Sequence, residues 1–266
     1  MRKKRLIPAL FASALIWISS LAVEPASASD LCLGGCPSGA SPSNTTITRS
    51  IYVLSNNPST KFADWVAYRI TRGTIGKSKQ RNWRADPDLP ASQTLEPSDY
   101  DGAPMALKID RGHQAPLAAF SGTADWSKTN YLSNITPQRS ALNQGPWEKL
   151  EAAEIRLAQR HDVAAVFVVT GTLYERPAGT LPAADEPHDI PSGYWKVVAV
   201  ESPSGIVAAG FLMHQNTPRS ANYCAHNVLI QDVEIRSRLD LFPQLPGELQ
   251  RSIERQPSEL LRMLGC

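Results

Sequence analysis

Residues 142–170 have the sequence LNQGPWEKLEAAEIRLAQRHDVAAVFVVT, in which a helical pattern gives way to a strand pattern. Pro146 suits the first turn of a helix, because the N–H that proline lacks would have no partner there. Arg156 falls in a later turn, where a cation interacts favourably with the helix dipole. Val163–Val169 is nearly continuous in apolar residues, which is typical of a strand buried on both faces. We therefore predict a helix over 146–160 that leads into a central strand.

Runs of β-branched and aromatic residues on both sides of this stretch predict further strands. These runs are 51–54, 65–70, 194–200 and 206–213. Two short helices are expected near the C-terminus, at 247–254 and 258–264. Residues 77–108 have little periodicity and contain several prolines, and loops of that length in a compact domain are usually functional. Strands clustered at both ends around a loop-and-helix insertion predict an α+β fold with a largely antiparallel central sheet and flanking helices.

The N-terminus has the pattern of a secretory signal peptide. Four basic residues at 2–5 precede an apolar run at 6–23, and Ala26-Ser27-Ala28 supplies the small residues that signal peptidase requires. A membrane anchor would need about 20 apolar residues, whereas proline and serine residues interrupt this run. We therefore expect a secreted or periplasmic protein. The expected organisation is a signal peptide at 1–28, a flexible lead-in at 29–48 that carries Cys32 and Cys36, and a single domain at 49–266.

The charge balance gives no general indication of a polyanionic partner. The chain has 27 Lys and Arg residues against 25 Asp and Glu residues. The signal peptide holds four of the basic residues and one acid, so its removal leaves a formal net charge of −1. A nucleic-acid site would therefore depend on local clustering of charge. One such cluster is either a phosphate-contacting surface or a solvated face; it consists of Arg69, Arg72, Lys77, Lys79, Arg81 and Arg84.

Four cysteines in an exported chain predict disulfides, and four cysteines allow three connectivities. We favour the pairing of sequence neighbours, Cys32 with Cys36 and Cys224 with Cys266. A zinc site is the alternative, but the sequence has no short C-x-x-C motif and no nearby histidine pair.

Residue types that suit phosphodiester cleavage gather in the middle of the chain. This reaction needs an attacking water, a group that takes its proton, and cations for the charge that builds on the phosphoryl oxygens. Asp110-Arg111-Gly112-His113 places an arginine and a histidine two residues apart, and Gly112 would let the backbone approach a ligand closely. If the helical path begins near residue 143, Asn143 and Glu151 lie along one side of it.

Three motifs resemble those of the DNA/RNA non-specific endonucleases. They are Asp-Arg-Gly-His-Gln-Ala-Pro at 110–116, Tyr-Leu-Ser-Asn-Ile-Thr-Pro-Gln at 131–138 and Leu-Asn-Gln-Gly-Pro-Trp at 142–147. The similarity extends from Arg81-Asn82-Trp83 to the terminal cysteine, and the cysteine layout resembles that of the secreted Serratia type. The resemblance implies a ββα-metal active site, hydrolysis of DNA and RNA to 5′-phosphorylated products, and a homodimer.

The resemblance also implies the residues of a metal centre. His113 would be the general base, and Asn143 the only direct protein ligand of Mg²⁺, with Mn²⁺ as an alternative ion. Mg²⁺ keeps several of its waters, so one amide ligand leaves positions for phosphate oxygens. Glu151 would hold a metal-bound water.

Substrate contacts follow from the same resemblance. Arg81 and Arg111 would bind the phosphate, because guanidinium groups match phosphate oxygens in geometry and charge. Arg84 is expected to be a further substrate-binding residue, and Asn134 to help organise the site. The chain departs from the pattern at Ile155, where the Serratia type has an arginine four residues beyond the glutamate.

Two other functions fit parts of this pattern. A nucleic-acid binding module could retain the fold without catalysis, but the residues expected to be catalytic are all present. A phosphoesterase acting on a small or lipid phosphodiester is the second alternative.

Overall fold

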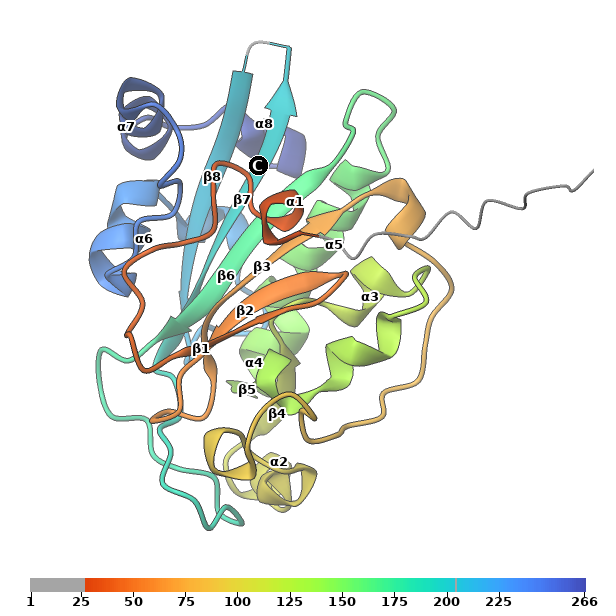
Figure 1. Cartoon of the computed structure of the whole chain (residues 1–266), viewed down its shortest axis with the longest axis vertical. Helices are drawn as coiled ribbons and strands as arrows, with labels where there is room; N and C mark the ends of the chain where they lie inside the picture. Colours follow the sequence, from red (N-terminus) through yellow and green to blue (C-terminus); the bar gives the residue numbers. More distant parts are fainter. Residues whose placement is uncertain (1–26, 204) are drawn as a thin grey trace, which may run out of the picture.

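A computed structural model describes residues 27–203 and 205–266 (Figure 1). The signal peptide expected at 1–28 lies almost wholly outside these residues. The strands are β1 (Thr45–Thr48), β2 (Tyr52–Asn56), β3 (Ala63–Ile70), β4 (Ile109–His113), β5 (Ile135–Arg139), β6 (Val166–Leu173), β7 (Gly193–Ser202), β8 (Gly205–His214) and β9 (Asn227–Val228).

Helices of several lengths connect and cover these strands. The α-helices are α1 (Ala28–Leu31), α2 (Ala103–Ala106), α3 (Leu117–Phe120), α4 (Ser140–Leu142), α5 (Glu148–Ala158), α6 (Ile230–Ser237), α7 (Gly247–Arg255) and α8 (Leu260–Leu264). Short 3₁₀ turns are η1 (Arg72–Thr74), η2 (Ala91–Gln93), η3 (Pro97–Tyr100), η4 (Trp126–Asn130), η5 (Leu132–Asn134) and η7 (Tyr223–His226), and η6 (Asn143–Trp147) is a π-helical turn.

The central sheet is antiparallel, as the sequence predicts. Its strand order is β1-β2-β3-β6-β7-β8-β9, so the strands before and after the insertion meet where β3 pairs with β6. The strands predicted at 51–54, 65–70, 163–169, 194–200 and 206–213 are confirmed as β2, β3, β6, β7 and β8, with bounds shifted by a few residues.

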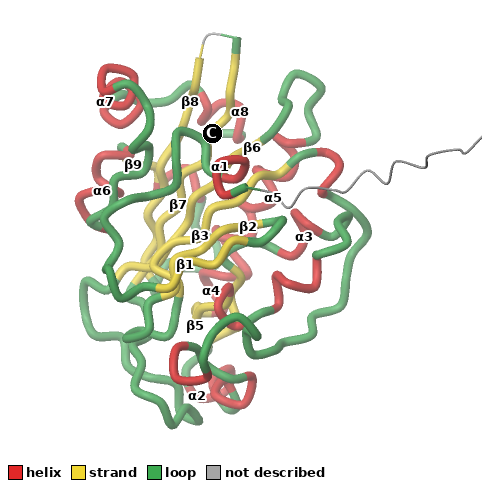
Figure 2. Tube along the Cα trace, viewed as in Figure 1, coloured by secondary structure: helices red, strands yellow, loops and turns green. Residues whose placement is uncertain are grey.

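Apolar side chains on both faces of the sheet form separate cores. On one face, Tyr68 and Val198 pack with α3, α5 and α8, and on the other Val53 and Trp195 pack with residues from α1 and α6. The helices accordingly lie on both sides of the strands (Figure 2). Because neighbouring residues of a strand point to opposite faces, the near-continuous apolar runs of the central strands fill both cores.

The insertion between β3 and β6 builds a smaller unit beside the sheet. β4 and β5 pair with each other, with His113 opposite Ile135, and α5 follows β5 after a short helical segment. A third apolar core, which includes Phe62, Tyr100 and Ile109, lies beneath this unit. The resulting order β4-β5-α5 is the ββα arrangement that the sequence led us to expect.

The expected lead-in at 29–48 is the main correction to the predicted organisation. Residues 45–48 form β1, the edge strand of the sheet, and pair with residues 53–56 of β2. Three β-branched threonines and Ile47, which is buried, favour this strand. The ordered fold thus begins before residue 49.

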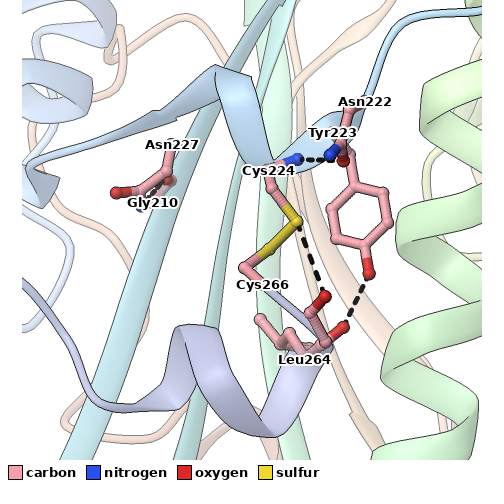
Figure 3. Close-up of a disulfide and its surroundings, with 8 residues drawn as sticks. Gly210, Asn222, Tyr223, Cys224, Asn227, Leu264 and Cys266 are labelled. Atoms are coloured by element: carbon pink, nitrogen blue, oxygen red, sulfur yellow. Dashed lines mark hydrogen bonds between the residues drawn. A yellow bond between two sulfur atoms is a disulfide. The ribbon is translucent and has the colours of Figure 1, made fainter.

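Both favoured disulfides are present. Cys32 bonds to Cys36, and Cys224 bonds to Cys266 across a sequence separation of 42. Figure 3 shows the second bridge beside Tyr223, whose hydroxyl donates to the carbonyl oxygen of Leu264 at 2.6 Å. The bridge therefore attaches α8 to η7. Among the described residues, no helix combines the length and apolarity needed to cross a membrane.

Candidate active site

A cleft of about 800 Å³ lies within the insertion, where the loop before β4, β4 itself, η6 and α5 all contribute to its walls. Among the residues that line it are His113 from β4, Asn143 from η6 and Glu151 from α5, together with Arg81 and Arg111. These five side chains come from segments up to 70 residues apart in the sequence, and the fold places them around one space.

His113 lies at the end of β4, held on two sides. Its Nε2 is 3.2 Å from Oδ1 of Asn130, and its ring centroid is 5.2 Å from that of Trp83. Because the Asn130 oxygen can only accept, this hydrogen bond places the imidazole proton on Nε2 and leaves the lone pair on Nδ1. Burial, together with the charge of Arg81, lowers the pKa of His113 to about 4 despite the hydrogen bond that His113 donates to Asn130. The imidazole is therefore neutral at neutral pH and able to accept a proton.

Asn143 is oriented by Asp110, whose role the sequence leaves open. The amide nitrogen of Asn143 donates to Oδ2 of Asp110 at 2.9 Å, and Gln144 donates to the same oxygen at 2.7 Å. Ser140 donates to the other carboxylate oxygen at 2.6 Å. With the Asn143 nitrogen engaged in this way, its amide oxygen is the atom left to bind a cation.

The turn that carries Asn143 explains how residue 143 and Glu151 come to share the cleft. Gln144 and Gly145 have non-helical backbone angles, so the chain changes direction before α5 begins at Glu148. A Cβ on Gly145 would lie 2.8 Å from the backbone of Arg219, so only glycine fits there. The predicted helix is thus preceded by a π-helical turn, and Asn143 reaches the cleft from that turn.

Glu151 is a mostly buried carboxylate at the cleft wall. Its Oε1 has no hydrogen-bond partner among the described residues and is 3.7 Å from Nζ of Lys196. Burial raises the pKa of Glu151 to about 7, the Lys196 charge opposes this shift, and the charges of Glu154 and Glu148 add to it. A positive charge arriving in the cleft would favour the ionised form.

The two expected phosphate-binding arginines differ in how they are held. The Arg111 guanidinium donates to the carbonyl oxygen of Pro97 at 2.6 Å and lies over the Tyr100 ring at 5.0 Å. Arg81 is exposed on the loop that precedes β4 and lines the opening of the cleft. Arg111 is therefore fixed in place before a ligand arrives, whereas Arg81 is free to adjust.

Arg84 and Asn134 do not line the cleft. Arg84 donates to the carbonyl oxygen of Ser127 at 3.1 Å and lies over the ring of Tyr131, so these contacts hold it outside the cleft lining. Its expected contact with substrate stays a prediction. Asn134 is fully buried, and its side chain bonds both the N–H and the carbonyl of Ala115. Asn134 thus fixes the backbone two residues after His113, which agrees with an organising role.

The basic cluster is only partly brought to the cleft. Lys79 and Arg81 line it. Arg72 instead binds the ring of His161 and the carbonyl oxygen of Arg160, and Arg69 lies over the Phe167 ring.

Gly112 is needed for the packing of β4 against β5. A Cβ at this position would lie 2.6 Å from Oε1 of Gln138 on β5. The expected approach of a ligand to this backbone stays a prediction.

Sequence inspection missed several residues that support the site. Asn130 and Trp83 contact His113, and the buried pair of Lys196 and Glu154 lies behind Glu151. The Arg81-Asn82-Trp83 segment, which belongs to the family resemblance, could have pointed to Trp83 as a site residue. The sequence around Lys196 contains no such indication, because a single lysine in an apolar strand usually indicates a solvated edge.

Comparison with known proteins agrees with this geometry. The family model described as DNA/RNA non-specific endonuclease matches residues 29–248. A nuclease of Serratia marcescens is 47% identical over 255 residues, which cover 96% of each chain. A nuclease of Nostoc sp. is 29% identical over 239 residues and 83% of each chain. A chain in the crystal structure of the EndoG/EndoGI complex has the same fold, with a TM-score of 0.66 and 23% identity over 76% of this chain and 86% of that one.

Proposed function

Because the chain belongs to the DNA/RNA non-specific endonuclease family, we propose that it is an exported enzyme that uses Mg²⁺ and the general base His113 to cut DNA and RNA. Export would follow from the expected signal peptide at 1–28, and the products would carry 5′-phosphates. Mn²⁺ is the alternative ion, and a homodimer is the assembly that the family resemblance suggests.

The observation that carries this proposal is the gathering of five side chains around one cleft. A proton acceptor, His113, shares the cleft with an amide, a carboxylate and two guanidinium groups, which are those of Asn143, Glu151, Arg81 and Arg111. A non-catalytic binding module would have no need for a base whose pKa is lowered to about 4 or for a mostly buried carboxylate that lines the cleft.

The residues present fit a hydrated divalent cation. Hard cations such as Mg²⁺ prefer oxygen ligands and retain water, and Asn143 offers an amide oxygen while its nitrogen is held by Asp110. The Glu151 carboxylate lines the cleft and is 18% exposed, so it suits a water of the hydrated ion. When bound, Mg²⁺ would supply positive charge that stabilises the developing charge on the phosphoryl oxygens.

The side chains of this chain would divide the remaining work. His113 removes a proton from the attacking water through Nδ1, while Asn130 keeps the ring oriented through Nε2. Arg111, held by the carbonyl oxygen of Pro97, and the exposed side chain of Arg81 bind the phosphate oxygens. None of these groups reads a base edge, which is consistent with cleavage of both DNA and RNA without sequence preference.

Cleavage of plasmid DNA and of RNA by the purified enzyme tests this proposal. Cutting with Mg²⁺ should stop when EDTA is added, and His113→Ala should lower kcat by about 10²–10⁴-fold, the usual contribution of a general base. Lys149→Ala is the matched control, because Lys149 is exposed on α5 and lies outside the cleft, and it should retain most of the activity. Cutting that persists in EDTA, or in the His113 variant, would contradict the mechanism.

A comparison of substrates separates the remaining alternative. The proposal predicts much faster turnover of DNA and RNA than of bis-p-nitrophenyl phosphate, because both arginines bind a polymer backbone. Preference for the small diester would favour the phosphoesterase.

A further inference from the structure

A buried cluster of charged and polar groups lies directly behind Glu151. It consists of Lys196 on β7, Glu154 on α5 and Tyr68 on β3, and we call it the Lys196 cluster. The side chains of Lys196 and Glu154 are 0% exposed, and their Nζ and Oε1 atoms are 2.9 Å apart. The Tyr68 hydroxyl donates to Oε2 of Glu154 at 3.1 Å. The cluster therefore joins the central sheet to the helix that carries Glu151.

The single positive charge of Lys196 faces two carboxylates. Its Nζ is 2.9 Å from Glu154 and 3.7 Å from Glu151, and it lies 4.5 Å above the centre of the Trp147 ring. Burying an ammonium group is costly unless opposite charges compensate it, and Glu154 provides that compensation. Glu151 is then attracted only by the part of the Lys196 charge that Glu154 does not neutralise.

Glu151 is the member of this group that reaches solvent. Its side chain is 18% exposed and lines the cleft, whereas Lys196 and Glu154 do not. The groups that face it are Lys196 from β7, Glu154 and Glu148 from α5, and Trp147 at the start of that helix. Lys196 is the cation that counters Glu148, Glu154 and burial, all of which disfavour an ionised Glu151.

We propose that Lys196 is a positioning residue of the metal centre, which holds Glu151 ionised and facing the cleft, and that Glu154 fixes the location of the Lys196 ammonium group. This inference rests on the proposed function, since it assigns Glu151 to the water of a hydrated cation. It adds a residue that touches neither cation nor substrate.

Two variants separate this role from simple packing. Glu154→Gln keeps a hydrogen-bonding group beside Tyr68 but removes the competitor for Lys196, so Glu151 should ionise at lower pH. Lys196→Met together with Glu154→Gln removes both buried charges, so that no carboxylate is left unpaired in the core, and Glu151 should ionise at higher pH. Both variants disturb packing, yet the predicted shifts in the pKa of Glu151 have opposite signs.

The affinity for Mn²⁺ is measured as a function of pH in the absence of nucleic acid. The electron paramagnetic resonance signal of free Mn²⁺ reports how much of the ion is unbound. Relative to the unmodified chain, we expect the midpoint of the pH dependence to fall for Glu154→Gln and to rise for the double variant. A difference of one pH unit between the variants corresponds to about tenfold in affinity below the midpoint. Lys149→Met, an exposed residue of α5, is the matched control and should leave the midpoint unchanged.

Three results would overturn the inference. If the two variants shift the midpoint in the same direction, or not at all, Lys196 has only a packing role, and plasmid cutting by the unmodified chain would still support the proposed function. If the unmodified chain binds no Mn²⁺, the metal centre itself is wrong and Lys196 has nothing to position. A cooperative unfolding transition of each variant shows that the comparison is made on folded protein.

Discussion

At His113 and Glu151, burial changes the proton affinity of two ionisable groups in opposite directions. Burial lowers the pKa of the imidazole to about 4 and raises that of the carboxyl to about 7. In both cases the neutral form is favoured, since desolvation penalises the charged form. For His113 the neutral form is the active base, whereas Glu151 must ionise to bind a hydrated cation. The protein therefore retains at residue 151 a charge that disfavours the folded state.

The cost of this charge predicts a stabilising substitution. The pKa of Glu151 in the folded protein is about 7, above the ordinary value of 4.5. Between these two pH values the folded state keeps a proton that the unfolded state releases. The stability that comes from protonated Glu151 is therefore complete below pH 4.5 and is lost as pH rises through 7. Glu151→Gln removes the ionisable group and should raise the free energy of unfolding at pH 8 by about 1–3 kcal/mol, with an effect near zero at pH 4.5. Urea unfolding in EDTA at the two pH values measures this.

Glu201→Gln serves as the control for that experiment. Glu201 is exposed near the end of β7 and lies outside the cleft, so its replacement should change stability little at either pH. A Glu151→Gln protein that is less stable than the unmodified chain at pH 8 would show that the carboxylate makes a favourable contact in the absence of metal.

On the scale of single elements, one face of α5 lines the cleft with Glu148, Glu151, Ala152 and Ile155. Ile155 lies one turn after Glu151, while Arg156 is exposed and does not line the cleft. Consecutive helix residues point about 100° apart, so Arg156 cannot replace the arginine that the Serratia type has at the position of Ile155. The phosphate-binding surface of this helix is thus apolar where an additional cation would fit.

Restoring that cation gives a prediction for α5. Ile155→Arg should improve kcat/KM or the affinity for DNA by about tenfold, the effect of one additional charge-assisted contact. Arg156→Ala should change neither value by more than a small factor, because its side chain lies outside the cleft. Kinetic constants that are unaltered in Ile155→Arg would mean that the phosphate does not pass this turn of the helix.

The elements that the sequence predicted are those with a clear apolar pattern. The five central strands are apolar and β-branched, and each was found within a few residues of its expected place. β4 and β5 were not predicted as strands, because Asp110, Arg111 and Gly112 interrupt one and Pro137 the other. α6 was also missed. These segments gain their structure from pairing with each other and from packing, which single-sequence patterns do not contain.

The residues of the site were also predicted only where the sequence has a recognisable pattern. His113, Asn143 and Glu151 belong to segments with recognisable motifs, and the structure places all three at one cleft. Arg84 lies in a recognisable segment too, but Ser127 and Tyr131 hold it elsewhere. Lys196 could not be predicted, because its burial depends on the meeting of β7 with α5. Residues that act through a neighbour therefore emerge only from tertiary structure.

On the scale of the whole molecule, the protein has little net charge, and its cleft carries cations beside carboxylates. The cations that line the cleft are Lys79 and Arg81 of the basic cluster and Arg111; the carboxylates are Asp110, Glu148 and Glu151. Affinity for a polyanion should then come from a few contacts, each of which releases counterions.

Salt dependence of DNA binding tests this distribution. In a His113→Ala background that does not cut, Lys79→Gln should reduce the slope of log affinity against log salt concentration by about one. Lys149→Gln, which removes an exposed charge outside the cleft, should leave the slope unchanged. An equal reduction in both variants would indicate diffuse attraction by the whole surface.

The bridge between Cys224 and Cys266 also determines how the protein withstands cleavage of its own chain. The residues between these cysteines, which include α6 and α7, form a covalent ring. A protease that cuts once within this ring leaves both fragments bonded, and α8 stays attached beside Tyr223. Such nicked molecules would migrate as intact chains in electrophoresis until a reducing agent releases the smaller piece.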